Sequence, residues 1–259
     1  MKTRILSGLI MVPLLAVLYF GGYVLTAACF IIAIVGVYEF FRGFKAMDVH
    51  PSYPVALLSA IFLYAMNIFT ENDTWHMLWL FLSVLLSMLY LFNIEHRKLE
   101  DAMSTIVGIV YVIFFSYHVL LVEQTDASIL IWLIVISAFG TDIFAYFTGM
   151  AIGKHKLCPH ISPKKSIEGS VGGTLASVIL CGLFGYFFAE EYLVHCFVIG
   201  LLGGIISQLG DLTASVFKRK MGIKDYGNLI PGHGGILDRF DSVLFTAPLV
   251  YYYIALVIG

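Results

Sequence analysis

Long apolar segments recur along the chain, and they constrain its fold more than any other feature. A helix of about 17–25 apolar residues can cross a bilayer, because it satisfies its backbone polar groups internally. The sequence predicts a polytopic all-α membrane helix bundle with a retained first helix and about nine spans. They lie at roughly 5–20, 23–41, 53–70, 75–93, 103–122, 127–150, 171–190, 193–217 and 240–258.

The composition excludes an ordinary soluble protein. Hydrophobic residues make up 60% of the chain and charged residues only 12%, whereas a soluble domain carries about 25% charged residues. The cysteines are scattered and form no CxxC pair: Cys29, Cys158, Cys181 and Cys196. This spacing indicates neither a disulfide framework nor a zinc site.

The basic residues predict the orientation in the membrane. With a cytoplasmic N-terminus, the nine-span topology puts all 15 Lys and Arg residues on the cytoplasmic side. The cytoplasmic segments are 1–4, 42–52, 94–102, 151–170 and 218–239. The opposite loops carry only acidic charges, which is the distribution of the positive-inside rule. We therefore expect a multi-pass protein of the cell membrane whose polar segments face the cytoplasm.

The two halves of the chain differ in their chemistry. Residues 1–122 offer little beyond apolar spans and are predicted to be a scaffold, with Glu39 at the membrane interface near the end of the second span. Residues 123–259 are predicted to be the catalytic region, with cytoplasmic loops 151–170 and 218–239.

Asp142 lies inside an apolar span, where a carboxylate costs a few kcal/mol and should face a cavity, a cation or a partner. A structural ion pair is the competing interpretation. In the following loop, Ser162, Lys164 and Lys165 are groups that favour phosphate, and Gly172 and Gly173 are expected at the start of the next helix. Such a start is a natural anion site, although the loop could also serve topology alone.

The eighth predicted span also carries polar and charged residues near its cytoplasmic end. Asp211, Ser215 and Lys218 are spaced i, i+4 and i+7, and therefore share one helix stripe. With Asp238 and Asp241, Asp211 supplies enough oxygen ligands for a magnesium site that keeps room for substrate phosphates.

The segment from Ser215 to Ser242 combines five basic residues, three aspartates and five glycines. Cations neutralise phosphate, and glycines let backbone N–H groups approach a ligand. A loop that only sets topology explains the basic residues, but it does not explain Asp238 and Asp241, three apart on one helix face. The residues thus favour phosphoryl or nucleotidyl transfer between a soluble nucleotide and a membrane substrate.

The run SxFKRxxxxKDxxxxIPGHGGxxDRxD in this segment resembles the signature of the CDP-diacylglycerol synthase (phosphatidate cytidylyltransferase) family. The stretches SPKKSIEGSVGG and GTDIFAYFTGMAIGKHK are also similar to the family pattern, so the resemblance covers about 138–242. It implies magnesium-dependent transfer of CMP from CTP to phosphatidate, giving CDP-diacylglycerol and pyrophosphate. It also implies a homodimer, a cavity open to cytoplasm and lipid, and a potassium ion near the magnesium.

The resemblance assigns roles to individual residues. Asp211 and Asp238 would hold magnesium, and Asp241 would support it or the second cation. The triphosphate and the phosphatidate headgroup would be neutralised by Lys218, Arg219, Lys224 and Arg239. The remaining substrate-binding candidates are Ser162, Lys164, Lys165, Ser215, Asp142, His233, Gly234 and Gly235.

Two other functions compete. A CTP-dependent lipid-alcohol kinase would move the terminal phosphate and release CDP, but the complete signature argues against it. A cation-coupled transporter predicts internal repeats with broken helices in both halves, whereas the polar residues of this chain gather in its C-terminal half.

Overall fold

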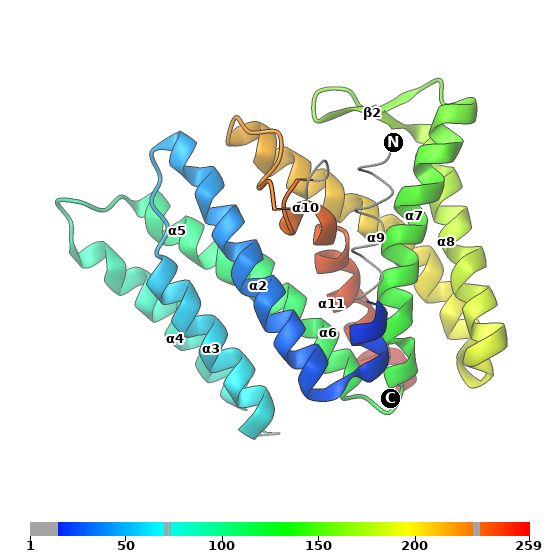
Figure 1. Cartoon of the computed structure of the whole chain (residues 1–259), viewed down its shortest axis with the longest axis horizontal. Coiled ribbons are helices and arrows are strands. Elements are labelled where there is room, and N and C mark those ends of the chain that lie inside the picture. The colour runs from blue at the N-terminus through cyan, green and yellow to red at the C-terminus, as the bar shows by residue number, and fades with distance from the viewer. Residues whose placement is uncertain (1–14, 70–71, 73, 230–233) are drawn as a thin grey trace. The chain divides into compact units, whose positions relative to one another are not determined.

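The computed structural model describes residues 15–69, 72, 74–229 and 234–259 (Figure 1). The chain forms two compact units. Unit 1 comprises Met1–Tyr117 and Lys220–Arg239, and unit 2 comprises His118–Arg219 and Phe240–Gly259. The first change of unit lies close to the predicted boundary at residue 122, but 220–239 groups with the N-terminal half. The assignment of scaffold and catalytic roles to the two halves stays a prediction.

The regular secondary structure described in unit 1 is helical. Its helices are α2 (Gly22–Phe44), α3 (Tyr53–Phe69), α4 (Thr74–Leu89) and α5 (Leu99–Gly108), with short turns at Lys45–Met47 and Tyr90–Phe92. A π-helical segment, Ile109–Phe114, joins α5 to α6 (Phe115–Glu123). Figure 1 shows α3 beside α4, where the indole of Trp79 donates to the carbonyl of Ser59 at 2.9 Å. The short α10 (Leu237–Phe240) begins in this unit.

Unit 2 contains three long helices and a small ribbon. The elements are α7 (Ile131–Ile152), β1 (Lys156–Cys158), β2 (Ser162–Ser166), α8 (Ile167–Phe188), α9 (Leu193–Lys220) and α11 (Val243–Tyr253). Short turns cover Ser128–Leu130 and Glu190–Tyr192, and a π-helical segment, Ile254–Ile258, follows α11. Strands β1 and β2 pair antiparallel between α7 and α8.

The close packing of α7 against α8 follows from their small residues (Figure 1). A Cβ on Gly173 would lie 2.6 Å from the carbonyl oxygen of Thr141 and 2.8 Å from the Cβ of Ala145. A Cβ on Gly169 would lie 2.7 Å from the carbonyl oxygen of Ala145. Small residues allow two backbones to come together, which is how helices associate in a membrane without a hydrophobic driving force.

The helices agree with the predicted spans wherever the structure describes them. Six helices are long and apolar enough to cross a membrane, and Tyr53–Phe69 and Val243–Ile258 are shorter apolar helices. These eight correspond to the second to ninth predicted spans. The first span, 5–20, lies largely outside the described residues, so the total of nine stays a prediction. The all-α membrane fold class is confirmed.

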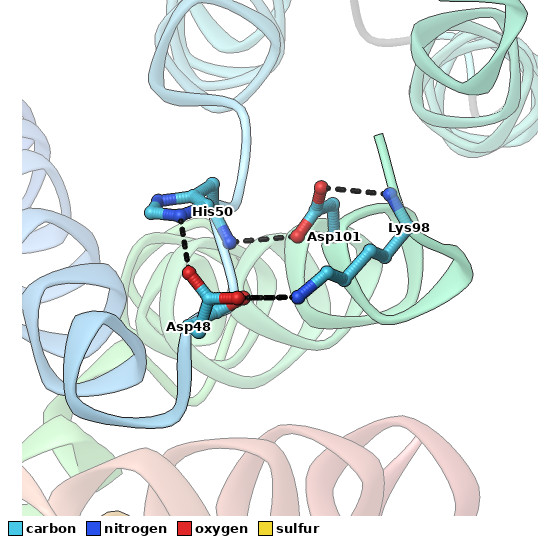
Figure 2. Close-up of polar contacts among 4 residues, drawn as sticks. All are labelled: Asp48, His50, Lys98 and Asp101. Carbon is cyan, nitrogen blue, oxygen red and sulfur yellow. Dashed lines mark hydrogen bonds and ion pairs between the residues drawn. The ribbon is translucent and has the colours of Figure 1, made fainter. Parts of the chain in front are cut away.

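Polar contacts join the turn after α2 to the start of α5 (Figure 2). Lys98 Nζ lies 2.5 Å from Asp48 Oδ2. The backbone N–H of His50 donates to Asp101 Oδ1 at 2.7 Å, and the N–H of Lys98 donates to Asp101 Oδ2 at 3.0 Å. The charges of both segments thus lie together, as expected for two loops on the same side of the membrane.

Candidate functional site

Asp238 organises the last part of the signature segment in unit 1. It is only 8% exposed. Its Oδ2 accepts hydrogen bonds from the backbone N–H groups of Tyr226 at 2.8 Å and Gly235 at 2.9 Å. Gly234 has φ 83°, and a Cβ there would lie 2.7 Å from the same oxygen. Since only glycine adopts this conformation readily, the two glycines of the HGG turn let the backbone close around the carboxylate.

Glu39 contacts the signature segment, which the sequence did not indicate. It lies near the end of α2 and is only 4% exposed, so it is packed inside unit 1, and its expected depth at the membrane interface stays a prediction. Its Oε2 accepts a hydrogen bond from the N–H of Leu237 at 2.9 Å. A carboxylate inside an apolar span is costly and needs a polar partner. This property of the sequence, which Glu39 shares with Asp142, could have indicated its contact.

Arg42 provides a second contact from α2 to the signature segment. Its Nη2 donates to the carbonyl oxygen of Tyr226 at 2.7 Å. Glu39 and Arg42 are three residues apart and therefore share one face of α2. The helix thus holds the segment both before and after the glycine-rich turn.

In unit 2, an ion pair joins the loop between α7 and α8 to α9. Lys165 Nζ on β2 lies 2.5 Å from Asp211 Oδ2, with side chains 23% and 26% exposed. The hydroxyl of Ser215 donates to Asp211 Oδ1 at 3.4 Å. The predicted stripe of Asp211 and Ser215 on one helix is confirmed, and Lys165 reaches it from a separate element.

Two further carboxylates belong to the same unit. Asp241 is buried, and it interacts electrostatically with Asp211, Asp142 and Lys218. The N–H of Ser242 donates to Asp241 Oδ1 at 2.8 Å, and its hydroxyl donates to Asp142 Oδ2 at 3.2 Å. Asp142 therefore faces a polar partner, as a carboxylate in an apolar helix requires. We call Asp142, Lys165, Asp211, Lys218 and Asp241 the unit 2 polar cluster.

The donor chemistry of these residues suits a hard cation such as Mg²⁺, which prefers carboxylate oxygens. Among the residues that the structure describes, no group of three or more His, Cys, Asp or Glu side chains is placed to hold a metal ion. Asp211 contacts the ammonium of Lys165, and Asp238 accepts two backbone N–H groups. The magnesium and potassium sites stay predictions.

The other candidates in the 151–170 loop occupy its second strand. Ser162 is half-buried on β2, and Lys164 is exposed. The expected helix start at Gly172 and Gly173 is wrong, because α8 begins at Ile167. Ser166 caps it earlier, with its hydroxyl accepting the N–H of Gly169 at 3.1 Å, a contact typical of helix N-termini.

The basic candidates near the signature differ in exposure. Arg219 is exposed, and its Nε donates to the carbonyl oxygen of Ile161 at 3.3 Å. Lys218 is half-buried and Lys224 is exposed. Arg239 is half-buried, and its Nε has no hydrogen-bond partner among the described side chains and backbone. His233 lies outside the described residues.

Comparison with known proteins places the chain in a family. The model of the cytidylyltransferase family matches residues 2–257. A protein of Synechocystis sp. named phosphatidate cytidylyltransferase is 32% identical over 98% of this chain and 97% of its own length. A Bacillus subtilis protein of the same name is 34% identical over 85% of this chain and 72% of its own. A Staphylococcus aureus protein of that name is 46% identical over a shorter match, 48% of this chain and 45% of its own. Because the family match extends over nearly the whole chain, the protein belongs to the cytidylyltransferase family, as the signature between Ser215 and Ser242 predicts.

Proposed function

We propose that the protein transfers CMP from CTP to phosphatidate, giving CDP-diacylglycerol and pyrophosphate for phospholipid synthesis. An oxygen of the phosphatidate phosphate would form a bond to the α-phosphorus of CTP. The bond from that phosphorus to the bridging oxygen would break, and pyrophosphate would leave with the electron pair. The attacking oxygen is already anionic at neutral pH, so the step requires no general base.

The observation that carries this proposal is the unit 2 polar cluster, in which α7, α9, strand β2 and the turn before α11 contribute charged side chains, in a chain that the cytidylyltransferase family matches over residues 2–257. The reaction brings two anions together, so its main demand is charge neutralisation and alignment. Lys165 and Lys218 would neutralise phosphate oxygens, and Arg219, Lys224 and Arg239 would add positive charge.

Magnesium is part of the proposal. Asp211 and Asp238 would hold it, with Asp241 in support, and a nearby potassium ion is expected from the family resemblance. Bound magnesium would neutralise triphosphate charge and polarise the reacting phosphoryl group. The protein's own carboxylates would therefore serve to position the cation, while its lysines and arginines position the phosphates.

The reaction would take place on the cytoplasmic side of the cell membrane, where CTP is available. Support for this side comes from the 15 Lys and Arg residues, which all fall in segments that the nine-span topology makes cytoplasmic. Two of those segments, the turn after α2 and the start of α5, are in polar contact. The family resemblance also supports a homodimer.

The test uses purified protein in detergent with phosphatidate, magnesium and CTP labelled at the α-phosphorus. We expect the label to enter the lipid fraction as an equal amount of pyrophosphate appears, and we expect chelation of magnesium to stop both. A parallel reaction with CTP labelled at the γ-phosphorus should leave the lipid unlabelled.

The outcomes separate the alternatives. Transfer of the γ-label to a lipid alcohol, with CDP as the product, would establish the kinase instead. Absence of both transfers in folded protein would overturn the enzymatic proposal and reopen the transporter.

A further inference from the structure

We propose that Glu39 is a positioning residue that sets the conformation of the signature segment in unit 1, and through it the positions of Asp238 and Arg239. This inference rests on the proposed function for its catalytic consequence, but not for its structural part. It assigns a role to α2, a helix of the half that the sequence predicts to be scaffold.

The burial of Glu39 is the first observation. Its side chain is 4% exposed within a 23-residue helix that is otherwise almost entirely apolar. Burying a carboxylate costs several kcal/mol unless hydrogen bonds and nearby charge compensate for it. The compensation comes from the signature segment, since the backbone N–H groups of Ile236 and Leu237 both interact with this carboxylate. Arg42 also interacts electrostatically with it.

The second observation is the fit of two glycines around the same carboxylate. Gly227 and Gly235 lie so close to Glu39 that a Cβ at either position would collide with its oxygens. A Cβ on Gly227 would also lie 3.0 Å from the Cα of Gly235. The two ends of the glycine-rich turn therefore meet at Glu39, and any larger residue at either end would separate them.

The third observation connects Glu39 to the predicted site. Gly235, which packs on Glu39, donates its N–H to Asp238 Oδ2 at 2.9 Å. Leu237, which donates to Glu39, directly precedes Asp238 in the chain. The two carboxylates thus hold neighbouring amides of one turn, and they also interact electrostatically. Moving Glu39 would move the backbone that orients Asp238 and Arg239.

The experiment compares Glu39→Ala, the isosteric Glu39→Gln and the control Glu100→Gln, which changes an exposed acid of the same unit. Hydrogen exchange followed by mass spectrometry reports on the turn itself. In Glu39→Ala we expect backbone exchange in 222–229 and 234–238 to rise about tenfold or more, as expected when local opening becomes easier. Peptides from α3 and α4 should keep their wild-type rates.

Kinetics distinguish positioning from simple loss of folded protein. We expect Glu39→Ala to lower kcat about 100-fold while KM for CTP changes less than about threefold, because the groups that it displaces act in the transition state. Glu39→Gln keeps the shape of the side chain and one acceptor oxygen. It should therefore keep most of the wild-type exchange protection, and its kcat should lie between those of Glu39→Ala and the wild type. Glu100→Gln should match the wild type in both measurements.

A fourth variant tests the packing around the carboxylate. Gly227 does not have positive φ, so alanine is allowed by its backbone, and the severest collision of its Cβ is with the Glu39 carboxylate, followed by a tight 3.0 Å approach to the Cα of Gly235. The double variant Glu39→Ala/Gly227→Ala removes the collision with the carboxylate, so its loss of exchange protection and kcat should be smaller than the sum of the losses in the two single variants, a non-additive result expected for residues in contact.

The outcomes are decisive for Glu39 even if one variant does not fold. If Glu39→Ala cannot be purified, Glu39→Gln and Gly227→Ala carry the same comparison. Wild-type exchange in 222–229 and 234–238 of Glu39→Ala or of Gly227→Ala, or equal losses in Glu100→Gln, would overturn the inference. A wild-type protein that fails to transfer CMP would overturn the proposed function alone, because the exchange measurement does not depend on turnover.

Discussion

Lys165 illustrates how one side chain can serve two purposes. The sequence predicts that it binds a substrate phosphate, and the structure shows its ammonium on the Asp211 carboxylate. A largely buried charge that loses its partner is costly. Each of these two residues therefore compensates the charge of the other, close to the carboxylates of Asp142 and Asp241. An anionic substrate that approached this cluster would offer Lys165 a second partner of the same chemistry.

The first prediction concerns this lysine and its neighbour on β2. Lys165→Met should lower kcat/KM for CMP transfer about 100-fold, because it removes a cation from the reacting phosphates and leaves Asp211 uncompensated. Lys164→Met, which changes an exposed residue, should lower it less than about tenfold. Steady-state kinetics of both purified variants give the comparison. Equal losses would indicate a diffuse electrostatic role for the whole loop.

At the scale of elements, α2 is held to α5 by the contacts shown in Figure 2. Hydrogen bonding to the ammonium of Lys98 lowers the pKa of Asp48 below its ordinary value of 3.8, with a smaller contribution from His50. The same contact raises the pKa of Lys98 above 10.5. Both shifts mean that the charged pair is favoured in the folded protein.

The second prediction follows from the sign of these shifts. A lowered carboxyl pKa contributes stability above its ordinary value and loses it as pH falls through the folded value, and a raised lysine pKa contributes stability that is lost as pH rises through its folded value. The Tm of wild type should therefore exceed that of Asp48→Asn by a constant amount between roughly pH 5 and 9. The difference should begin to shrink as pH falls below 3.8 or rises above 10.5, and it should disappear beyond the lowered pKa of Asp48 and the raised pKa of Lys98 in the folded protein.

Thermal melting in detergent across this pH range makes the measurement, and Lys98→Met should show the same two limits. Asp48→Asn also removes the contact of Asp48 with His50, so the part of the difference that both variants share belongs to the ion pair of Asp48 with Lys98. If the Tm difference vanished near neutral pH, a titrating group other than Asp48 and Lys98 would be responsible for it.

The third prediction concerns the packing of α7 on α8. Gly173→Ala should lower Tm by about 5 °C, because its Cβ would meet the backbone of Thr141 and overpacking costs about 1–3 kcal/mol. Val171→Ala is the matched control, since Val171 is exposed on the same helix turn. Equal melting temperatures of all three proteins would show that the two helices can separate without cost.

At the scale of the whole molecule, the charge distribution predicts a single orientation in the membrane. The natural cysteines offer a test, because Cys158 is half-buried in the 151–170 loop whereas Cys29, Cys181 and Cys196 are buried. Cys158 should therefore be the most reactive thiol of the described residues.

The fourth prediction is that a membrane-impermeant maleimide labels Cys158 in inverted membrane vesicles and not in intact cells. Cys158→Ser should remove this labelling. In that background, Glu191→Cys in the opposite loop should be labelled in intact cells. The reverse pattern would invert the topology and place the signature segment outside the cytoplasm.

The fold class, the helix positions and the family could be predicted from the sequence, because they depend on local properties. Apolar length alone indicates a membrane helix, and this is why the second to ninth spans coincide with helices. The stripe formed by Asp211 and Ser215 follows from the helical period. The beginning of α8 was misplaced because a hydropathy window does not detect the Ser166 cap.

The contacts that organise the site were decided only by the tertiary structure. Glu39 meets Leu237 across 198 positions of the chain, and Lys165 meets Asp211 from a different element. A sequence period shows which residues share a face, but it does not show what that face touches. For that reason the sequence did not show that Glu39 contacts Leu237 or that Lys165 contacts Asp211.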